Sequence, residues 1–318
     1  MRFVLRADAS QSIGAGHVMR SSAIAEELIA RGEEVIFVGQ ISDLPWVEER
    51  ITSLGFARIF IQTRDFISRA ESDVLLLDSY ICEINDPFID PENWLHIVAI
   101  VDELTPNYPC TLRIHPGLDS DWTGKSAIPI LSGPKYIPFR SSLSRNIHTD
   151  RDQKQVLKIA VVAGGSDPHG LVNEIAKILS AMSEQFEAYL FSGPTVDSIL
   201  DSRFFYVEVG PGIDEVTRDV DLVLTTASTS SLEFIARGLC VGIICAVNNQ
   251  EQYYISLSQL GVAAPLGFRN SENKWDLDRQ KISSLINSSE LRENLTTRAS
   301  GLIDFNGASR IVDAITNL

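Results

Sequence analysis

The stretch Ser12-Ile13-Gly14-Ala15-Gly16-His17-Val18-Met19-Arg20 lies between a short apolar segment, residues 3–5, and a helical pattern over residues 18–30. The order strand, glycine turn and helix is typical of the first βα unit of a parallel α/β sheet. The glycines let backbone amides approach a ligand closely, and amides at a helix start favour anions. An imidazole, which can act as a base near neutral pH, stands at this junction in His17.

The alternation of this unit continues along both halves of the chain. Segments rich in Val, Ile and Leu alternate with amphipathic segments, and this pattern predicts parallel sheets covered on both faces. The expected strands are residues 3–5, 35–38, 59–61, 74–77, 95–101, 112–114, 157–162, 188–191, 205–209, 222–224 and 241–246. The expected helices of the second half are residues 171–182, 229–237 and 250–260, followed by a helical tail over residues 276–318.

A change in composition divides the two halves. Residues 116–155 contain several prolines and glycines and end in a charged polar run, so we expect a domain boundary near residue 150. The fold class predicted is α/β, with two Rossmann-like domains that face a cleft. Residues 1–150 would form the N-terminal domain, and residues 151–318 would form the C-terminal domain with its helical tail.

The charge balance excludes some partners. The 318 residues include 27 Lys and Arg against 42 Asp and Glu, a net charge of −15. Nonspecific nucleic-acid binding depends on neutralising phosphates, and docking on anionic membranes also needs basic residues, so neither is expected. The sequence has no signal-peptide pattern, no apolar segment of membrane-spanning length and no CxxC pair. We therefore expect a soluble cytoplasmic protein without stable membrane insertion.

Glycine and hydroxyl clusters follow two predicted strands of the second half. Gly164-Gly165-Ser166 leaves room for a pyrophosphate or a base against the backbone, or it is a plain tight turn. The hydroxyl-rich run 225–231 can cap a helix and bind phosphate at the N-terminus of that helix. Glu233 can accept both hydroxyls of a ribose. The alternative is a capping box formed by Ser230 and Glu233.

Two other polar clusters follow strands, at Leu77-Asp78-Ser79-Tyr80 and at Asn248-Asn249-Gln250. The carboxyl ends of parallel strands face the ligand crevice in this architecture. The alternatives are an interfacial aromatic for Tyr80, a simple N-cap for the amides, and a helix-capping role for His17. NAD binding is disfavoured, because the glycine turn lacks a third glycine and the second strand ends in Val38-Gly39-Gln40 without an acidic residue.

Taken together, the motifs resemble those of a known family, and the resemblance covers nearly the whole chain. The family is that of the UDP-2,4-diacetamido-2,4,6-trideoxy-β-L-altropyranose hydrolases of pseudaminic acid biosynthesis, which are similar to the N-acetylglucosaminyltransferase that makes lipid II. The matching residues are Gly14–Arg20, Asp78-Ser79-Tyr80, Gly133-Pro134-Lys135-Tyr136, Gly164–Pro168, Ser228–Glu233, Asn249-Gln250 and Asp304–Arg310. Two departures concern sugar specificity: Asp102-Glu103 stands where two aspartates are expected, and Arg113-Ile114-His115-Pro116 has no counterpart.

The resemblance implies a GT-B fold in which the C-terminal domain binds UDP and the N-terminal domain brings His17. It implies inverting hydrolysis of a UDP-linked sugar to UDP and free sugar without metal or cofactor. By the same resemblance His17 is the base for water, Tyr80 and Asn249 assist, and Glu233 holds the ribose. The substrate- and UDP-binding residues predicted are Gly14, Gly16, Arg20, Gly165, Ser166, Ser228, Thr229, Glu233 and Gln250.

Two other functions remain open from the sequence. A glycosyltransferase of the same fold would use an acceptor hydroxyl where the hydrolase uses water, and Leu44-Pro45-Trp46-Val47 is a modest candidate for an apolar acceptor patch. A non-catalytic UDP-sugar-binding protein is the third possibility. Asp150-Arg151-Asp152 has the form of a metal-binding DxD run but lies in the polar linker, so we expect solvated surface there. A monomer or weak homodimer is expected.

Overall fold

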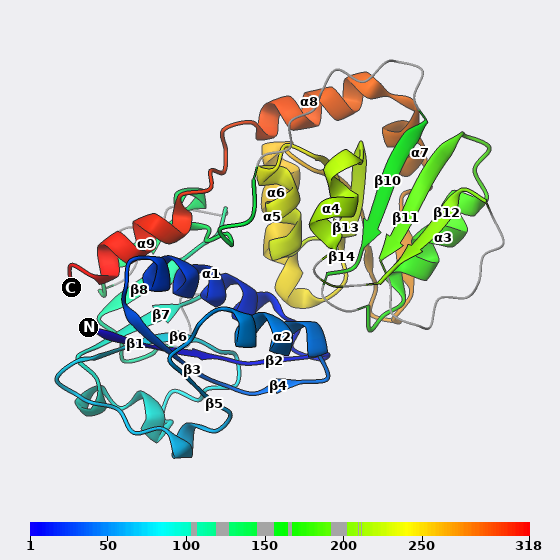
Figure 1. Cartoon of the computed structure of the whole chain (residues 1–318). Helices are drawn as coiled ribbons and strands as arrows, with labels where there is room; N and C mark the ends of the chain where they lie inside the picture. Colours follow the sequence, from blue (N-terminus) through cyan, green and yellow to red (C-terminus); the bar gives the residue numbers. More distant parts are fainter. Residues whose placement is uncertain are drawn as a thin grey trace. The chain divides into compact units, whose positions relative to one another are not determined.

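The computed structural model describes residues 1–102, 107–118, 127–144, 156–164, 167–191, 202–208, 210 and 212–318. The chain forms two compact units. Unit 1 comprises Met1–Ser142 and Asp304–Leu318, and unit 2 comprises Leu143–Ile303. Within each unit a twisted sheet is flanked by helices (Figure 1).

Unit 1 contains a sheet of seven described strands in which every neighbouring pair is parallel. The first strand, β1, is the third of the seven, and the strand order reverses between it and its neighbour β6. In order across the sheet the strands are β5 (Arg58–Phe60), β3 (Glu34–Val38), β1 (Arg2–Ala7), β6 (Asp73–Asp78), β7 (His96–Ile100), β8 (Leu112–His115) and β9 (Ile130–Ser132). Two short strands, β2 (Ala9–Ser10) and β4 (Ile41–Ser42), form a separate pair.

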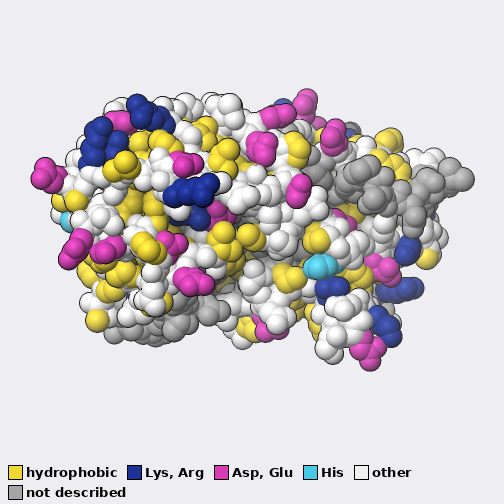
Figure 2. Space-filling view, turned by 90° about the horizontal axis from the view of Figure 1, so that it is seen from below, with side chains coloured by type: hydrophobic (Ala, Val, Ile, Leu, Met, Phe, Trp, Pro, Cys, Tyr) yellow, Lys and Arg dark blue, Asp and Glu magenta, His cyan; other side chains and the backbone are white. Residues whose placement is uncertain are grey.

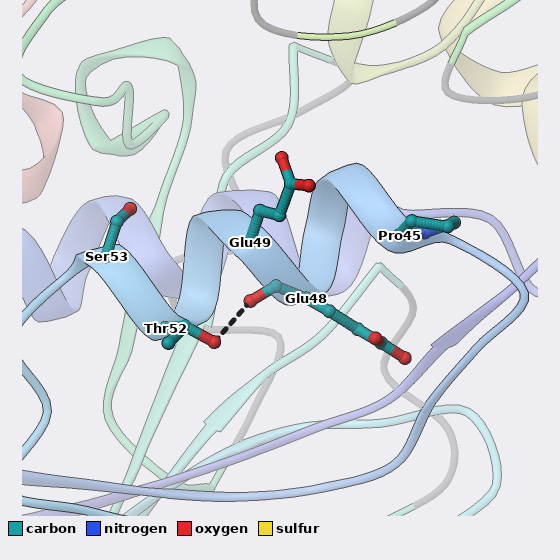
Figure 3. A pocket seen from close by; sticks show the side chains of 5 residues that line it. All are labelled: Pro45, Glu48, Glu49, Thr52 and Ser53. Carbon is teal, nitrogen blue, oxygen red and sulfur yellow. Dashed lines mark hydrogen bonds between the residues drawn. The ribbon is translucent and has the colours of Figure 1, made fainter.

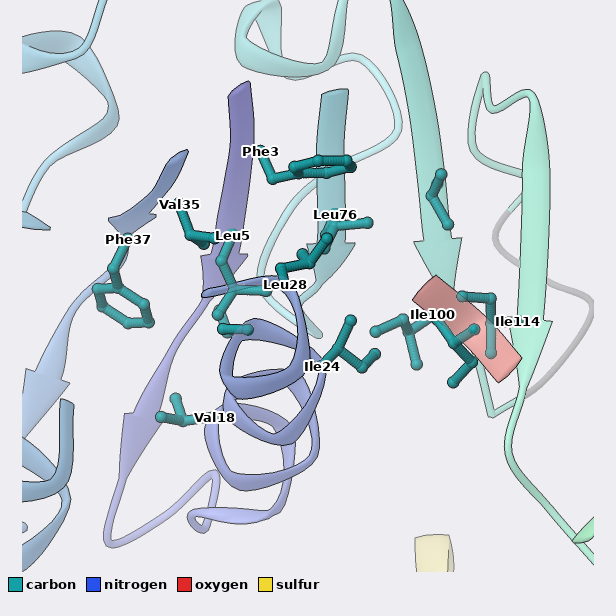
Figure 4. Packing of buried hydrophobic residues seen from close by; sticks show 14 of the residues in the cluster. Phe3, Leu5, Val18, Ile24, Leu28, Val35, Phe37, Leu76, Ile100 and Ile114 are labelled. Atoms are coloured by element: carbon teal, nitrogen blue, oxygen red, sulfur yellow. The ribbon is translucent and has the colours of Figure 1, made fainter. Parts of the chain in front are cut away.

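The helices of unit 1 bury apolar faces against this sheet. Val18, Ile24 and Leu28 of α1 (Gly16–Ala30) lie in one core cluster with Phe3 and Leu5 of β1, as Figure 4 shows. Since β1 is buried along its whole length, its sequence is continuously apolar at the centre rather than alternating. The remaining helices of the unit are α2 (Pro45–Ser53), α9 (Gly307–Ile315) and the 3₁₀ turns η1 (Thr63–Asp65), η2 (Pro87–Ile89), η3 (Pro91–Asn93) and η4 (Pro134–Tyr136).

Unit 2 repeats the same strand order. Its first strand, β10, lies between the second and the fourth, and only the last described pair, β15 with β16, is antiparallel. The strands are, in order across the sheet, β12 (Phe204–Val207), β11 (Phe186–Phe191), β10 (Leu157–Val162), β13 (Leu222–Thr226), β14 (Cys240–Cys245), β15 (Ala264–Arg269) and β16 (Trp275–Leu277). The helices are α3 (Leu171–Ser180), α4 (Ile213–Val216), η5 (Thr217–Asp219), α5 (Thr229–Ala236), η6 (Asn248–Gln250), α6 (Glu251–Leu260), α7 (Arg279–Asn287) and α8 (Ser289–Ala299).

The α/β class and the expected strands are confirmed, but the pattern missed β2, β4, β9, β15 and β16. Pro265 and Gly267 interrupt the apolar pattern of β15. Gly267 is needed there, because its φ is 131° and a Cβ atom would lie 2.0 Å from the carbonyl oxygen of Asp276. The start of the expected helical tail was wrong: Trp275–Leu277 pairs with β15, and the next helix begins at Arg279.

The last helix, α9, belongs to unit 1, whereas the sequence predicted that all of residues 151–318 form the C-terminal domain. Ile311, Val312 and Ile315 are fully buried in the core cluster that also contains α1. Gly307 makes a close approach, since a Cβ atom there would lie 2.0 Å from the carbonyl oxygen of Ile137. Arg310 donates to the carbonyl of Lys135 over 2.9 Å. The two motifs Gly133–Tyr136 and Asp304–Arg310 therefore contact each other, and the boundary expected near residue 150 lies outside the described residues.

The surface carries charges of both signs. On the face drawn in Figure 2, Lys and Arg side chains are interspersed with Asp and Glu. Within the described ranges, no helix combines the length and the apolar character that crossing a membrane requires.

Candidate functional site

The glycine turn that follows β1 and the short strand β2 places His17 at the carboxyl end of the sheet. Gly14 has a φ of 84°, a conformation that favours glycine, and its amide donates to the Ser10 carbonyl over 2.7 Å. Helix α1 then starts with Ala15 as N-cap and no side-chain cap. A helix-capping role for His17 is therefore wrong. The His17 side chain is only 7% exposed, and its Nδ1 lies 2.5 Å from Oδ1 of Asp78, the last residue of β6.

The partners of Asp78 determine which ring nitrogen of His17 carries the proton. Arg20 donates to both Asp78 oxygens over 2.7 Å, and Ser21 Oγ donates over 2.8 Å. Burial alone would raise the pKa of Asp78, but Arg20 and His17 hold that pKa well below its usual range. An ionised carboxylate only accepts hydrogen bonds, so Nδ1 of His17 is the donor in the short contact. The lone pair of neutral His17 is then on Nε2, the atom required of a base.

Tyr80 and Asp102 complete this cluster. The Tyr80 hydroxyl donates to Oδ2 of Asp102 over 2.5 Å, and Arg20 Nη1 donates to Oδ1 over 2.6 Å. Tyr80 is 52% exposed as a residue, and its ring meets the His17 ring edge to face, with centroids 3.9 Å apart. Burial of the hydroxyl and the charge of Asp102 raise the pKa of Tyr80, so its phenol stays protonated at neutral pH. Arg20, predicted to contact substrate, has its guanidinium held between two carboxylates.

Hydrogen bonds on both sides of Tyr80 fix its backbone. Ser79 Oγ donates to Asp8 Oδ2 over 2.9 Å, and Asp8 also accepts the Gln40 amide over 2.9 Å. The Tyr108 hydroxyl contacts the carbonyls of Ser79 at 3.3 Å and of Cys82 at 3.0 Å. Residues from the ends of β1, β3 and β6 thus converge where the strand order reverses, the usual ligand position in such sheets.

The corresponding position of unit 2 holds hydroxyls and a glycine. Gly164 has a φ of 85°, and a Cβ atom there would lie 3.9 Å from Thr226 Oγ1. Thr226 Oγ1 and Ser228 Oγ are 3.1 Å apart, and Ser228 is the N-cap of α5 without a side-chain cap bond. Thr225 Oγ1 is buried and has no hydrogen-bond partner among the described residues. The start of α5 thus presents hydroxyls beside uncapped helix amides.

Other predicted residues of unit 2 are placed as follows. Thr229 is the first residue of α5, and the half-buried Glu233 is the fifth. The capping-box alternative is wrong, because Ser228 rather than Ser230 is the N-cap. Gly165 and Ser166 lie outside the described residues, as does the DxD run at residues 150–152.

The side-chain amides of Asn249 and Gln250, after β14, lie in different environments. Gln250 Oε1 accepts the Ala246 amide over 2.9 Å, so this side chain braces its own turn. Asn249 is exposed. Gln250 is the N-cap residue of α6, as the N-cap alternative predicts for this cluster, but its side chain makes no cap bond, and the N-cap of η6 is Val247.

Sequence patterns alone assigned no role to Asp78, Asp102 or Ser21. Asp78 and Asp102 share one signal: each is an acidic residue at or just after the end of a buried strand, β6 and β7. Because neighbouring parallel strands end at the same edge of a sheet, this signal could have placed the two carboxylates close together. The signal that would have linked them is Arg20, a cation one turn after His17.

A shallow pocket lies elsewhere in unit 1, along α2 (Figure 3). Pro45 of the candidate acceptor patch lines it, but none of the predicted catalytic or UDP-binding residues does. The side chains of Glu48 and Glu49 point in different directions (Figure 3). Thr52 donates to the Glu48 carbonyl within the helix over 2.8 Å. This surface therefore offers no paired carboxylates. In the described part of the chain, no group of three or more His, Cys, Asp or Glu is placed to hold a metal ion.

Comparison with known proteins defines the fold. No protein-family profile and no curated protein matches the sequence. Among solved structures, Acinetobacter baumannii MurG is similar with a TM-score of 0.67 and 12% identity, with all of both chains covered. The glycotransferase of kitacinnamycin has a TM-score of 0.67 at 14% identity, with 99% of this chain and 98% of that chain covered. The spinosyn rhamnosyltransferase SpnG, complexed with thymidine diphosphate, has a TM-score of 0.66 at 12% identity, with 98% and 100% covered.

The protein has the GT-B fold, with two Rossmann-like units of seven-stranded sheets. These neighbours are GT-B glycosyltransferases, and at such identities the similarity establishes the architecture alone.

Proposed function

We propose that the protein is a UDP-sugar-dependent enzyme that displaces UDP from the anomeric carbon with inversion, with His17 as the base. The observation that carries the proposal is the contact of His17 Nδ1 with the ionised, fully buried Asp78. This contact leaves Nε2 as the proton acceptor and stabilises the imidazolium that forms. General base catalysis of this kind typically contributes about 10²- to 10⁴-fold.

The bond changes of the proposed reaction are as follows. The attacking oxygen forms a bond to the anomeric carbon while the bond from that carbon to the diphosphate oxygen breaks. The proton of the attacking oxygen passes to His17 Nε2, and UDP leaves with the bonding electron pair. The helix amides and hydroxyls at Ser228 and Thr229 are suited to the diphosphate charge. Glu233 is proposed for the ribose, and Asn249 for the sugar side of the site.

Transfer to an acceptor hydroxyl is the form of the reaction that the structural neighbours favour, because they are glycosyltransferases. Hydrolysis, and with it a 2,4-diacetamido-trideoxy sugar as substrate, is the second candidate. The order of the motifs from Gly14–Arg20 to Asp304–Arg310 favours it. The same base serves both reactions, since water and an alcohol each lose one proton to it.

The experiment that tests the proposal is incubation of the protein with a panel of UDP-linked amino sugars, with and without hydroxyl acceptors. NMR follows UDP, the sugar product and the anomeric configuration together. Transfer predicts UDP release that depends on the acceptor, whereas hydrolysis predicts UDP and inverted free sugar without one. Binding of UDP-sugars without turnover under either condition would contradict the catalytic proposal and support a binding protein.

A further inference from the structure

We propose that Asp102 is a positioning residue that holds the proton of the Tyr80 hydroxyl, so that Tyr80 meets the substrate as a hydrogen-bond acceptor. The contact that carries the inference is the 2.5 Å hydrogen bond from the Tyr80 hydroxyl to Asp102 Oδ2. The inference rests on the proposed function, because the substrate group concerned is one that approaches His17. It assigns a role to a carboxylate that the base itself does not touch.

The number of protons around Tyr80 supports this role. A phenol carries one proton, and an ionised carboxylate has none to give back. While the proton of Tyr80 points to Asp102, only lone pairs remain on the phenol oxygen. A substrate group that approaches this oxygen must therefore donate, as a hydroxyl, a water or an amide N–H does. Tyr80 is 52% exposed as a residue, so such a group can approach its side chain.

Arg20 keeps Asp102 in the state that this role requires. Burial would raise the pKa of Asp102, but the guanidinium of Arg20 and the hydrogen bonds from Arg20 and Tyr80 lower it. Arg20 Nη1 and Nη2 donate to the two Asp102 oxygens at 2.6 and 3.2 Å, while Nε and Nη2 bind Asp78. The Asp102 side chain is 22% exposed and that of Asp78 is 0% exposed. Asp102 is thus the outer carboxylate of the pair.

The ionisation of Tyr80 reports on this contact without any substrate. The charged or titratable groups that face Tyr80 are Asp102, Arg20, Asp78 and His17. Burial and Asp102 raise the pKa of Tyr80, whereas Arg20 lowers it. Replacing Asp102 by a neutral side chain should therefore move the pKa of Tyr80 down, toward the ordinary value of about 10.

The first experiment is an ultraviolet titration of tyrosinate on the folded full chain. The wild type is compared with Tyr80→Phe, and Asp102→Asn with Asp102→Asn/Tyr80→Phe, so that each difference isolates Tyr80. We expect Tyr80 to ionise at lower pH when Asp102 is replaced. An unchanged titration would overturn the inference. Should Asp102→Asn not fold, Asp102→Ser gives the same comparison with a smaller neutral side chain.

The second experiment is a double-mutant cycle on turnover with the nucleotide sugar found active. Asp102→Asn should lower kcat about tenfold in the wild type and less than about threefold in Tyr80→Phe, because the hydroxyl it positions is already absent. Asp65→Asn, at an exposed position, is the matched control. Losses that multiply independently would overturn the inference. If no nucleotide sugar is turned over, the proposed function fails, and the titration still decides the role of Asp102.

Discussion

The two units place different chemistry at the same point of the same topology. In unit 1 the strand order reverses between β1 and β6, where His17, Arg20 and Asp78 form a buried ionic cluster. In unit 2 it reverses between β10 and β13, where Gly164 faces Thr226 and Ser228 caps α5. Both positions are loops at the carboxyl ends of strands. Under the proposed function, the sheet topology sets where the ligand binds, and the side chains after the strands set its chemistry.

The difference in charge separates the two positions. Unit 1 contains buried charged side chains, and their mutual contacts leave one ring nitrogen of His17 as a proton acceptor. Unit 2 presents neutral hydroxyls and helix amides, which can donate hydrogen bonds to an anion. We accordingly expect substitutions in unit 1 to change turnover and those in unit 2 to change nucleotide affinity.

The largest effect is expected at His17. His17→Asn removes the proposed base and should lower kcat about 10²- to 10⁴-fold. UDP affinity, measured by calorimetry, should stay unchanged because the proposed nucleotide groups lie in unit 2. His96→Asn, at the opposite end of strand β7 from Asp102, is the matched control. An equal loss of UDP affinity in His17→Asn would contradict the assignment of turnover to unit 1 and nucleotide binding to unit 2.

Asp78 should couple stability to pH in unit 1. Asp78→Asn leaves Arg20 with a weaker partner and should lower the free energy of unfolding by about 3–5 kcal/mol at pH 7. The pKa of Asp78 is depressed in the fold, so its stabilisation is complete above the unfolded value of about 3.9. That stabilisation is lost as the pH falls further. The difference in the free energy of unfolding between wild type and Asp78→Asn should therefore become smaller at acid pH.

Urea unfolding over a series of pH values measures this gap. Asp65→Asn again serves as the control, because this carboxylate is exposed and its nearest cation is 3.9 Å away. A gap that is constant from neutral to acid pH would show that Asp78 contributes packing rather than charge.

A smaller effect is expected where α9 meets the rest of unit 1. Gly307→Ala places a Cβ atom against the Ile137 carbonyl and should cost about 1–3 kcal/mol of unfolding free energy. Gly212→Ala in unit 2, with a φ of −70° and open space around it, should be nearly neutral. Equal thermal shifts in the two variants would contradict the close docking of α9.

The smallest effect is expected in unit 2. Ser228→Ala removes one hydroxyl beside the start of α5 and should weaken UDP binding about 3- to 10-fold, with kcat nearly unchanged. Ser284→Ala, whose hydroxyl bonds to the Gln280 carbonyl of its own helix over 2.9 Å, is the control. A fall in kcat with unchanged UDP affinity would reverse the roles assigned to the two units.

The sequence alone determined the α/β class, the positions of most strands and the glycine turn that carries His17. These features depend on local patterns: continuous apolar runs, glycines and the helix that follows. The strands it missed, β2, β4, β9, β15 and β16, are short or contain Pro and Gly, and their pairing partners stabilise them more than their own composition does.

Tertiary structure alone decided which side chains meet. His17 and Asp78 are 61 positions apart, and Arg20 and Asp102 are 82 apart, so no spacing in the chain links them. The same holds for α9. Its apolar pattern does not say which unit its buried face packs against, and in the structure it packs in unit 1. Side-chain contacts depend on which strands are neighbours in the sheet, and long-range pairing leaves only a weak trace in one sequence. The local patterns of the sequence placed His17, the proposed base, at the start of a helix after a glycine turn, and the sheet supplied the carboxylate that its ring contacts.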